Sequence, residues 1–344
     1  MNNINLIQIN PLVSPYWDEA VLNSLSPQFF HLSCWIRTLV ETYNFKPLCF
    51  TFSDKYGSTI PMLKTKTLIG RKKAVALPFS DCCDIDTDVT GSDELVDRLL
   101  YIAREENLDH LEFLGVSRFM PSGEPSHSYY GHRLQLTKDE KKLWKNLSSS
   151  KQRNVKKAQR ENVAITFSND ISSVQEFFRI HCITRKRHGL PPQPFSFFDA
   201  IHRNIISRGG AEVALASIEK RIVAAAIFLF CKSEVLFKFG ASDKSLQNMR
   251  SNDFLMWEAI RRYAQKGFTL FSFGKTEICH DGLCRFKEGF GALRVSLFDH
   301  IYDVSNGKKR IESPNVQGFH NRIFRNMPIA LLRLSGKLLY KYSA

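Results

Sequence analysis

Apolar and polar positions alternate along the chain in blocks that predict strands and helices in turn, most clearly in the second half. Five apolar runs there predict strands, at residues 212–218, 222–231, 235–241, 269–273 and 295–304. Apolar side chains at the helical spacing predict helices, at residues 174–187, 197–208 and 252–266. Ser251 stands directly before the last of these helices and is expected to cap it.

The first half carries a second set of such blocks. Its apolar runs predict strands, at residues 48–53, 59–65, 74–78 and 110–114. Its amphipathic segments predict helices, at residues 30–43 and 93–106. The 344 residues of the chain exceed what one hydrophobic core usually covers. We therefore predict two mixed α/β domains, residues 1–136 and 137–305, with a tail formed by residues 306–344.

The net charge of +14 is concentrated in two segments. Residues 133–161 hold ten Lys/Arg against three acidic residues, and residues 306–344 hold eight against one, so the rest of the chain is balanced. A basic surface confined in this way indicates a polyanionic partner, such as nucleic acid, a phosphorylated carrier or an anionic membrane. A solvated face that only keeps the protein soluble is the alternative.

The first basic segment is a predicted helical connector with few apolar side chains. Such a helix suits contact with an anion better than burial in a core. Its candidate polyanion-binding residues are Lys151, Arg153, Lys156 and Lys157.

The eight cysteines include no CxxC pair, and most stand in apolar runs, which is typical of buried, reduced thiols. Cys279, His280, Asp281 and Cys284 lie close in sequence, but no second cluster completes a tetrahedral site. The acidic run at residues 84–88 lacks the glycine and glutamate of a calcium loop. We predict no metal.

The first twenty residues lack the basic and apolar regions of a signal peptide. The longest apolar stretch, residues 222–231, is too short to span a bilayer. The sequence therefore predicts a cytoplasmic protein, unless another feature brings it to the inner face of a membrane.

Six short segments of the second half, in this order, resemble the Fem-type peptidyltransferases and the acetyltransferase-like proteins grouped with them. They are KQRNVKKA (151–158), RKRHGLP (185–191), FGAS (239–242), LMWEAI (255–260), FSFG (271–274) and FKEGFG (286–291). In the first half, residues 29–31 with Trp35 and residues 77–79 also fit, so the likeness covers roughly residues 29–302.

The resemblance implies two GNAT-like domains in tandem, each a mixed sheet flanked by helices. It also implies transfer of an aminoacyl group from aminoacyl-tRNA, or of an acyl group from a donor such as acyl-CoA, to an amine. Residues 241–250 lack the glycine-rich pyrophosphate loop of GNAT enzymes, and the chain has no room for the coiled-coil arm of some tRNA-using members.

The resemblance also implies site residues. Lys287, beside Phe286, would place a fixed positive charge near an oxyanion or a leaving group, although a surface lysine is the alternative. The glycines Gly274, Gly289 and Gly291 would let the backbone approach the substrate, or else form ordinary turns. No general base is assigned; the candidates are Asp253, Glu258 and Glu277.

Further substrate-binding candidates lie at two of the helices predicted in the second half, residues 174–187 and 252–266. Arg185 and Arg187, before Gly189, would hold a phosphate or carboxylate, unless they are simply solvated. Ser242, Ser251 and Asn252 would lie where a following helix receives the anionic part of a donor.

The tail carries Arg333, Lys337 and Lys341 at helical spacing beside a stripe of Leu331, Leu334, Leu338 and Tyr342. A basic amphipathic helix over residues 328–342 either lies on an anionic membrane or packs on the body of the protein. Membrane contact would suit a lipid-linked amine acceptor.

Three functions fit the sequence. The first is an N-acyltransferase that acts on a cell-envelope, peptidoglycan or polysaccharide precursor. The second is a nucleic-acid-binding protein that uses the basic connector, although no known binding module is present. The third is a catalytically inactive GNAT-like scaffold, which the missing phosphate loop favours.

Overall fold

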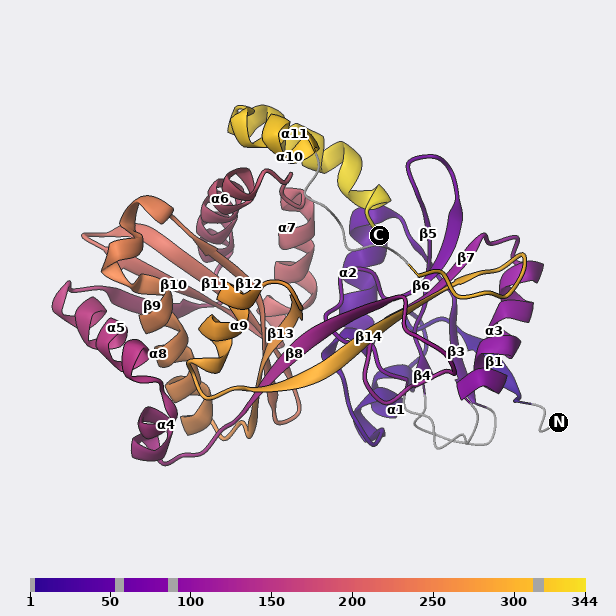
Figure 1. Cartoon of the computed structure of the whole chain (residues 1–344), viewed down its shortest axis with the longest axis horizontal. Helices are drawn as coiled ribbons and strands as arrows, with labels where there is room; N and C mark the ends of the chain where they lie inside the picture. The colour runs from indigo at the N-terminus through magenta and orange to yellow at the C-terminus, as the bar shows by residue number, and fades with distance from the viewer. Residues whose placement is uncertain (1–3, 53–58, 86–91, 312–318) are drawn as a thin grey trace. The chain divides into compact units, whose positions relative to one another are not determined.

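The computed structural model describes residues 4–52, 59–85, 92–311 and 319–344. The chain forms two compact units (Figure 1). Unit 1 consists of Met1–Tyr130, Ser296–Asn315 and Lys341–Ala344, and unit 2 of Gly131–Val295 and Val316–Tyr340. The expected division followed the sequence continuously, whereas each of these units is built from separate segments.

Unit 1 is a mixed α/β body. Its helices are α1 (Trp17–Asn23), η1 (Phe29–His31), α2 (Ser33–Tyr43) and α3 (Ser92–Glu105). Its strands are β1 (Leu6–Ile9), β2 (Lys46–Pro47), β3 (Cys49–Phe52), β4 (Thr59–Ile60), β5 (Leu63–Lys66), β6 (Lys72–Ala76) and β7 (His110–Val116). Here β1, β3 and β4 form a small sheet, while β2, β5, β6, β7 and β14 (Leu293–Asp303) follow one another in a larger one.

Unit 2 repeats the mixed architecture. Its helices are α4 (Glu140–Asn146), α5 (Ser149–Arg160), α6 (Ile171–His188), α7 (Phe195–Asn204), η2 (Ile206–Arg208), η3 (Lys244–Met249), α8 (Ser251–Gln265), α9 (Asp281–Glu288), α10 (Phe319–Asn326) and α11 (Ile329–Leu339), before η4 (Tyr340–Tyr342). Its strands follow one another as β8 (His127–Gln135), β13 (Leu270–Glu277), β12 (Glu234–Ser242), β11 (Arg221–Cys231), β10 (Ala211–Ile218) and β9 (Ala164–Ser168). The strands and helices predicted in this half are confirmed, with small shifts at their ends.

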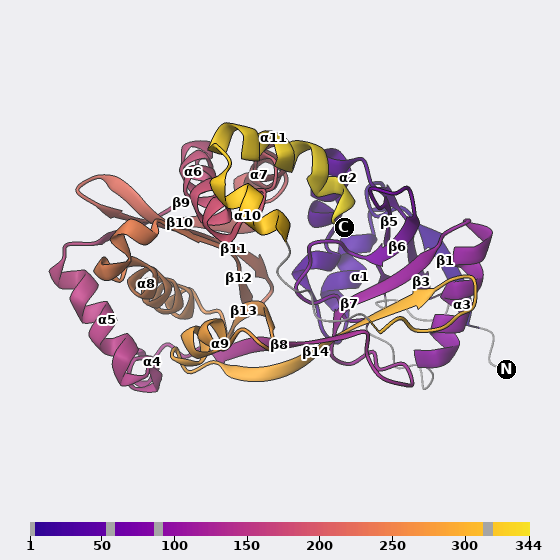
Figure 2. The same cartoon turned by 45° about the horizontal axis from the view of Figure 1, so that its top comes forward.

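Helices cover both faces of the sheet of unit 2 (Figure 1, Figure 2). Phe239 of β12 contacts the rings of Phe177 in α6 and Phe198 in α7, at centroid distances of 6.3 and 5.5 Å. Phe228 of β11 contacts Tyr263 of α8 at 5.2 Å. Aromatic side chains therefore fill the core on each side of the sheet, as the high phenylalanine content suggests.

The strands β12 and β13 diverge. They are parallel and pair at three positions, Glu234 with Leu270, Val235 with Phe271 and Leu236 with Ser272. Both strands then continue, to Ser242 and Glu277, and among the described residues no further pair joins them. The two strands therefore separate after Leu236 and Ser272.

The tail helices pack on α6 through two glycines. A methyl group on Gly189, at the end of α6, would lie 2.1 Å from the carbonyl oxygen of Asn321 in α10. One on Gly336 of α11 would lie 2.0 Å from the carbonyl oxygen of Pro192. Leu332 is fully buried beside this contact. The inner face of α11 thus packs on the body of unit 2.

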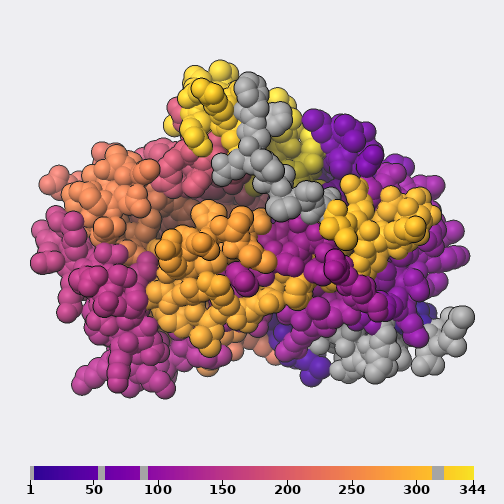
Figure 3. Space-filling view, viewed as in Figure 1, coloured from indigo at the N-terminus to yellow at the C-terminus, as the bar shows by residue number. Residues whose placement is uncertain are grey.

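The outer face of α11 remains apolar. Leu331, Leu334 and Leu338 are 53%, 51% and 58% exposed, and α11 forms part of the surface of unit 2 (yellow in Figure 3). No helix in the described part of the chain has both the length and the apolar content needed to cross a membrane.

Candidate functional site

Lys287 lies beside β13, just past the last residue of that strand that pairs with β12. Its ammonium group donates hydrogen bonds to the carbonyl oxygens of Gly274 at 3.0 Å and Lys275 at 3.3 Å, and to Oγ1 of Thr276 at 2.7 Å. These groups follow Ser272, where the pairing of the two strands ends. Lys287 is 2% exposed. The side chain therefore holds a buried positive charge at the point where β13 leaves β12.

The glycine at the same place is needed for the shape of the strand. Gly274 has φ of +69°, a conformation that side chains with a Cβ atom adopt reluctantly. Its carbonyl is one of the three acceptors of Lys287. Gly274 and Lys287 are therefore brought together, as the sequence motifs that contain them suggested.

His132 on β8 is a buried group that sequence reasoning missed. Burial first, and then the charge of Lys287, lower its pKa to about 4. Its Nε2 lies 3.8 Å from the Glu288 carboxylate, beyond hydrogen-bond distance, and neither ring nitrogen has a hydrogen-bond partner among the described residues. The neutral imidazole therefore keeps its capacity to hydrogen-bond a ligand.

Lys151 of α5 is buried beside the end of α9. It forms an ion pair with Asp253, in the first turn of α8, and Asn154 donates to the other carboxylate oxygen at 2.8 Å. Its ammonium also lies 3.8 Å from the ring centroid of Phe286 and 4.6 Å from that of Phe290. Burial lowers the pKa of Lys151, and the neighbouring carboxylate opposes this shift. Phe286 therefore contacts a cation, while Lys287 faces β13.

Gly289 and Gly291, which follow α9, allow α5 and α4 to approach the chain closely at this point. A Cβ atom on Gly289 would lie 2.9 Å from Cε of Lys151, and its carbonyl accepts from the amide of Ser148 at 2.9 Å. Gly291 has φ of +84° and would meet Asn146 at 3.2 Å. In this structure both glycines make room for protein neighbours.

The four basic residues predicted to bind a polyanion have different surroundings. Arg153 and Lys156 are exposed and Lys157 is partly exposed, whereas Lys151 is buried in its ion pair. The exposed basic face of the connector therefore starts after Lys151.

Helix α8 begins differently from the prediction. Ser251 is its first residue, and Arg250, with φ of +60°, occupies the capping position. Oγ of Ser251 is buried, and within the described segments it has no hydrogen-bond partner. Asn252 follows and is exposed. The start of this 15-residue helix thus combines backbone amides with an unused hydroxyl group, an arrangement that favours an anion.

Ser242, at the end of β12, is tied to α6. Its amide donates to Oγ1 of Thr184 at 2.8 Å, and its carbonyl accepts from Thr184 at 3.1 Å and from Arg187 at 3.4 Å. Arg185 instead donates to the carbonyl oxygen of Pro191 at 3.0 Å. Of the two arginines, Arg187 is therefore the one that the structure brings to β12, and Gly189 ends the helix that carries both.

The described residues contain no group of three His, Cys, Asp or Glu that is placed to hold a metal ion. Asp84 accepts backbone hydrogen bonds from Ser117, Arg118 and Phe119 at 2.9–3.0 Å, so its carboxylate orders a loop of unit 1. Asp86 and Asp88, the other members of the acidic run, lie outside the described residues.

Comparison with known proteins identifies the fold. Residues 146–288 match the family described as an acetyltransferase (GNAT) domain. The crystal structure of FemX is similar with a TM-score of 0.66 at 14% identity, over 86% of this chain and 97% of that chain. The structure of L-PGS from Bacillus licheniformis has a TM-score of 0.53 at 14% identity, over 97% and 98% of the two chains. No curated protein matches the chain.

A further solved structure bears on the domain organisation. The tandem GNAT protein from the clavulanic acid biosynthesis pathway, without AcCoA, has a TM-score of 0.53 at 7% identity, over 91% of this chain and 100% of that chain. Together these similarities confirm that the chain has a tandem GNAT fold and resembles FemX in its fold. The domain match lies within unit 2 and confirms an acyltransferase domain there.

Proposed function

From the premise that residues 146–288 form a GNAT acetyltransferase domain, we propose that the chain moves an acyl or aminoacyl group from an activated donor to an amine. The acceptor we propose is a precursor of the cell envelope, peptidoglycan or a polysaccharide. The observation that carries this proposal is the separation of β12 from β13, with the buried side chain of Lys287 bound to β13 just after the last pair.

The chemistry of acyl transfer explains why this arrangement suits it. When an amine attacks an activated carbonyl group, the carbonyl oxygen gains negative charge, which a fixed positive charge in a water-poor site stabilises. The leaving group departs with the electron pair of the broken bond, and the proton that the amine loses ends on that leaving group, which is released as a thiol or an alcohol. Lys287, fixed by three acceptors, meets the requirement for a cation that does not need to reorganise during the reaction.

The start of α8 fits the phosphate groups that both candidate donors carry. Ser251 offers a buried hydroxyl group without a partner, and Arg250 is exposed beside it. Where β12 no longer pairs with β13, an extended, amide-containing arm would add backbone hydrogen bonds along the strand. Acyl-CoA, when bound, would supply the acyl group as a thioester. Ser251, Asn252 and Arg250 are the residues that would hold its phosphates.

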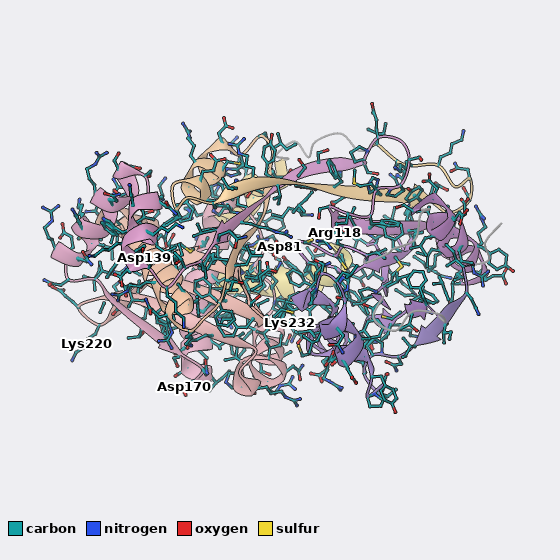
Figure 4. The ribbon with its side chains drawn as sticks, turned by 90° about the horizontal axis from the view of Figure 1, so that it is seen from below. Asp81, Arg118, Asp139, Asp170, Lys220 and Lys232 are labelled. Atoms are coloured by element: carbon teal, nitrogen blue, oxygen red, sulfur yellow. The ribbon has the colours of Figure 1, made fainter. Side chains whose placement is uncertain are left out.

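Titration of the full-length protein with acetyl-CoA, a long-chain acyl-CoA and charged tRNA tests the donor. We expect saturable binding of one donor class, weakened about tenfold in Arg250→Asn, because one hydrogen bond to a charged group is lost. Lys220→Asn is the matched control, since Lys220 is also exposed, has φ of +67° and stands at the turn between β10 and β11 (Figure 4).

Two results would contradict this proposal. RNA binding that ignores the aminoacyl group and leads to no transfer would favour a nucleic-acid-binding protein that uses Arg153, Lys156 and Lys157. Failure of all three donors to bind would leave an inactive scaffold as the better description.

The tail supports an acceptor at a membrane surface. The exposed side chains of Leu331, Leu334 and Leu338 lie on the outer face of α11. Residues 319–344 contain five Lys/Arg and no acidic residue. An apolar stripe with basic neighbours and no opposing acid matches an anionic lipid surface in both hydrophobicity and charge.

Vesicle sedimentation tests this contact. The triple substitution Leu331→Ser, Leu334→Ser and Leu338→Ser should abolish most binding to vesicles that contain phosphatidylglycerol, since it removes the apolar face and keeps every charge. Val13→Ser with Leu25→Ser removes two other side chains that are 77% and 74% exposed and should leave binding intact. Equal binding of all three proteins would refute the membrane contact.

A further inference from the structure

Unit 1 contains a cavity of about 500 Å³ beside the edge of its larger sheet. Five lysines line it, from β2, β5, β6 and the C-terminal residues: Lys46, Lys64, Lys66, Lys72 and Lys341. A single acidic side chain, Glu106, lies among its lining residues. We call this set of lysines the lysine pocket.

The strand register forces four of these lysines together. Lys46 pairs directly with Lys64 across β2 and β5, and Lys66 pairs directly with Lys72 across β5 and β6. Residues that are directly opposite in an antiparallel pair point to the same face, and so do residues two apart on one strand. All four ammonium groups therefore leave the sheet on one side.

This arrangement places like charges side by side, although Lys46, Lys66 and Lys72 are exposed and the solvent screens part of their repulsion. Like charges that lie directly opposite across two strands repel each other. Glu106 pairs with Lys64 at 2.9 Å, but among the described residues Lys46, Lys66 and Lys72 form no ion pair. The other face of the same hairpin is different, because Lys73 pairs there with Glu112 at 3.1 Å.

Protection of a sheet edge does not explain the pattern. Lysines on an outer strand discourage association with other strands. Here β2 is the outer strand, whereas Lys64, Lys66 and Lys72 stand on the second and third strands of the order. The repulsion is therefore placed at the cavity, where a bound anion would relieve it.

The cavity also has aromatic walls. Tyr43 and Phe45 stack with their ring centroids 5.3 Å apart, and Tyr342 lies next to Lys341, whose ammonium is 4.8 Å from its ring centroid. Rings and ammonium groups together suit a ligand whose compact, multiply charged anionic group is joined to a less polar part.

We infer that the lysine pocket binds a ligand that carries a phosphate or pyrophosphate group. Several ammonium groups that converge from three strands match the several oxygen atoms of such a group. A soluble phosphorylated molecule and the headgroup of an anionic lipid share this chemistry. The inference concerns unit 1 and does not depend on the proposed acyl transfer.

Calorimetric titration of the full-length protein with inorganic pyrophosphate tests the inference, without any acyl donor or acceptor. We expect saturable binding that weakens as salt is added. The double substitution Lys66→Gln with Lys72→Gln should weaken it at least about tenfold, because charge-assisted hydrogen bonds are lost. The melting temperature should stay the same or rise, because a repelling pair is removed.

The matched control is Lys220→Gln with Lys232→Gln, which removes two exposed lysines from turns of unit 2 (Figure 4). Lys46→Gln provides a second variant if the first melts early. Equal weakening in the control and the pocket variants would overturn the inference. So would a failure to bind pyrophosphate combined with vesicle binding that is absent or that the pocket variant leaves unchanged, since α11 alone would account for the latter. If the pocket variant loses vesicle binding, the ligand is a lipid headgroup; if it loses only pyrophosphate binding, the ligand is soluble.

Discussion

Replacing Lys151 by methionine should lower the free energy of unfolding by about 3–5 kcal/mol. The side chains of Lys151 and Asp253 are only 9% and 10% exposed, so the substitution leaves a buried carboxylate with Asn154 as its remaining described side-chain partner. Methionine keeps the packing of the aliphatic stem against Gly289, whereas the contacts of the ammonium group with the rings of Phe286 and Phe290 are lost together with the charge. The loss therefore reports on the charge and not on a cavity. Urea denaturation of the full-length protein measures it.

The companion variant separates this explanation from a packing defect. Lys151→Met combined with Asp253→Leu removes both charges, and we expect it to recover most of the lost stability, because a buried ion pair is often replaceable by apolar side chains. If the double variant is as unstable as the sum of the two single variants, the two side chains do not act as a pair.

Replacing Lys287 by methionine should lower kcat for acyl transfer about 100- to 1,000-fold, the usual effect of removing one group that stabilises an oxyanion. The same change leaves the carbonyl groups of Gly274 and Lys275 without their donor. A loss of stability of about 1–3 kcal/mol is expected as well, because buried polar groups are left unsatisfied. The rate is measured with the donor that the titration identifies.

A control on the same helix separates a catalytic role of Lys287 from the general effect of removing a positive charge. Arg285→Met removes an exposed cation two residues before Lys287, and its kcat should stay close to that of the wild type. Both rates are measured with saturating substrate and well below the melting temperature of either variant, so that a difference in kcat does not come from unfolding. If the two variants lose activity equally, Lys287 has no special role in transfer.

The fold of unit 2 was largely predictable because its signals are local. The helix predicted at residues 174–187 is α6 (Ile171–His188), and the run at residues 222–231 is β11 (Arg221–Cys231). Both have a regular apolar spacing and a clear stop. The start of α8 was less predictable, since Ser251 has the chemistry of a cap but follows a residue in the left-handed conformation.

Several residues of the candidate site could be predicted from the sequence, but the contacts that they make could not. The acceptors of Lys287 exist because two strands diverge, which no local pattern shows. The burial of Lys151 had a signal, because Lys151 stands on the same helical face as Val155 and Ala158. His132 likewise lies two residues before the buried Leu134 on β8. Residues two apart on a strand share a face, so predicting a strand there would have predicted the burial of His132.

The discontinuous build of unit 1 has a consequence during synthesis on the ribosome. Strand β7 pairs with β6 on one side and with β14 on the other, yet β14 is translated only after nearly all of unit 2. Until then, one side of the mostly apolar β7 has an unfilled row of backbone donors and acceptors, which is a template for wrong pairing. The larger sheet of unit 1 therefore stays without β14 until about 180 further residues have been translated.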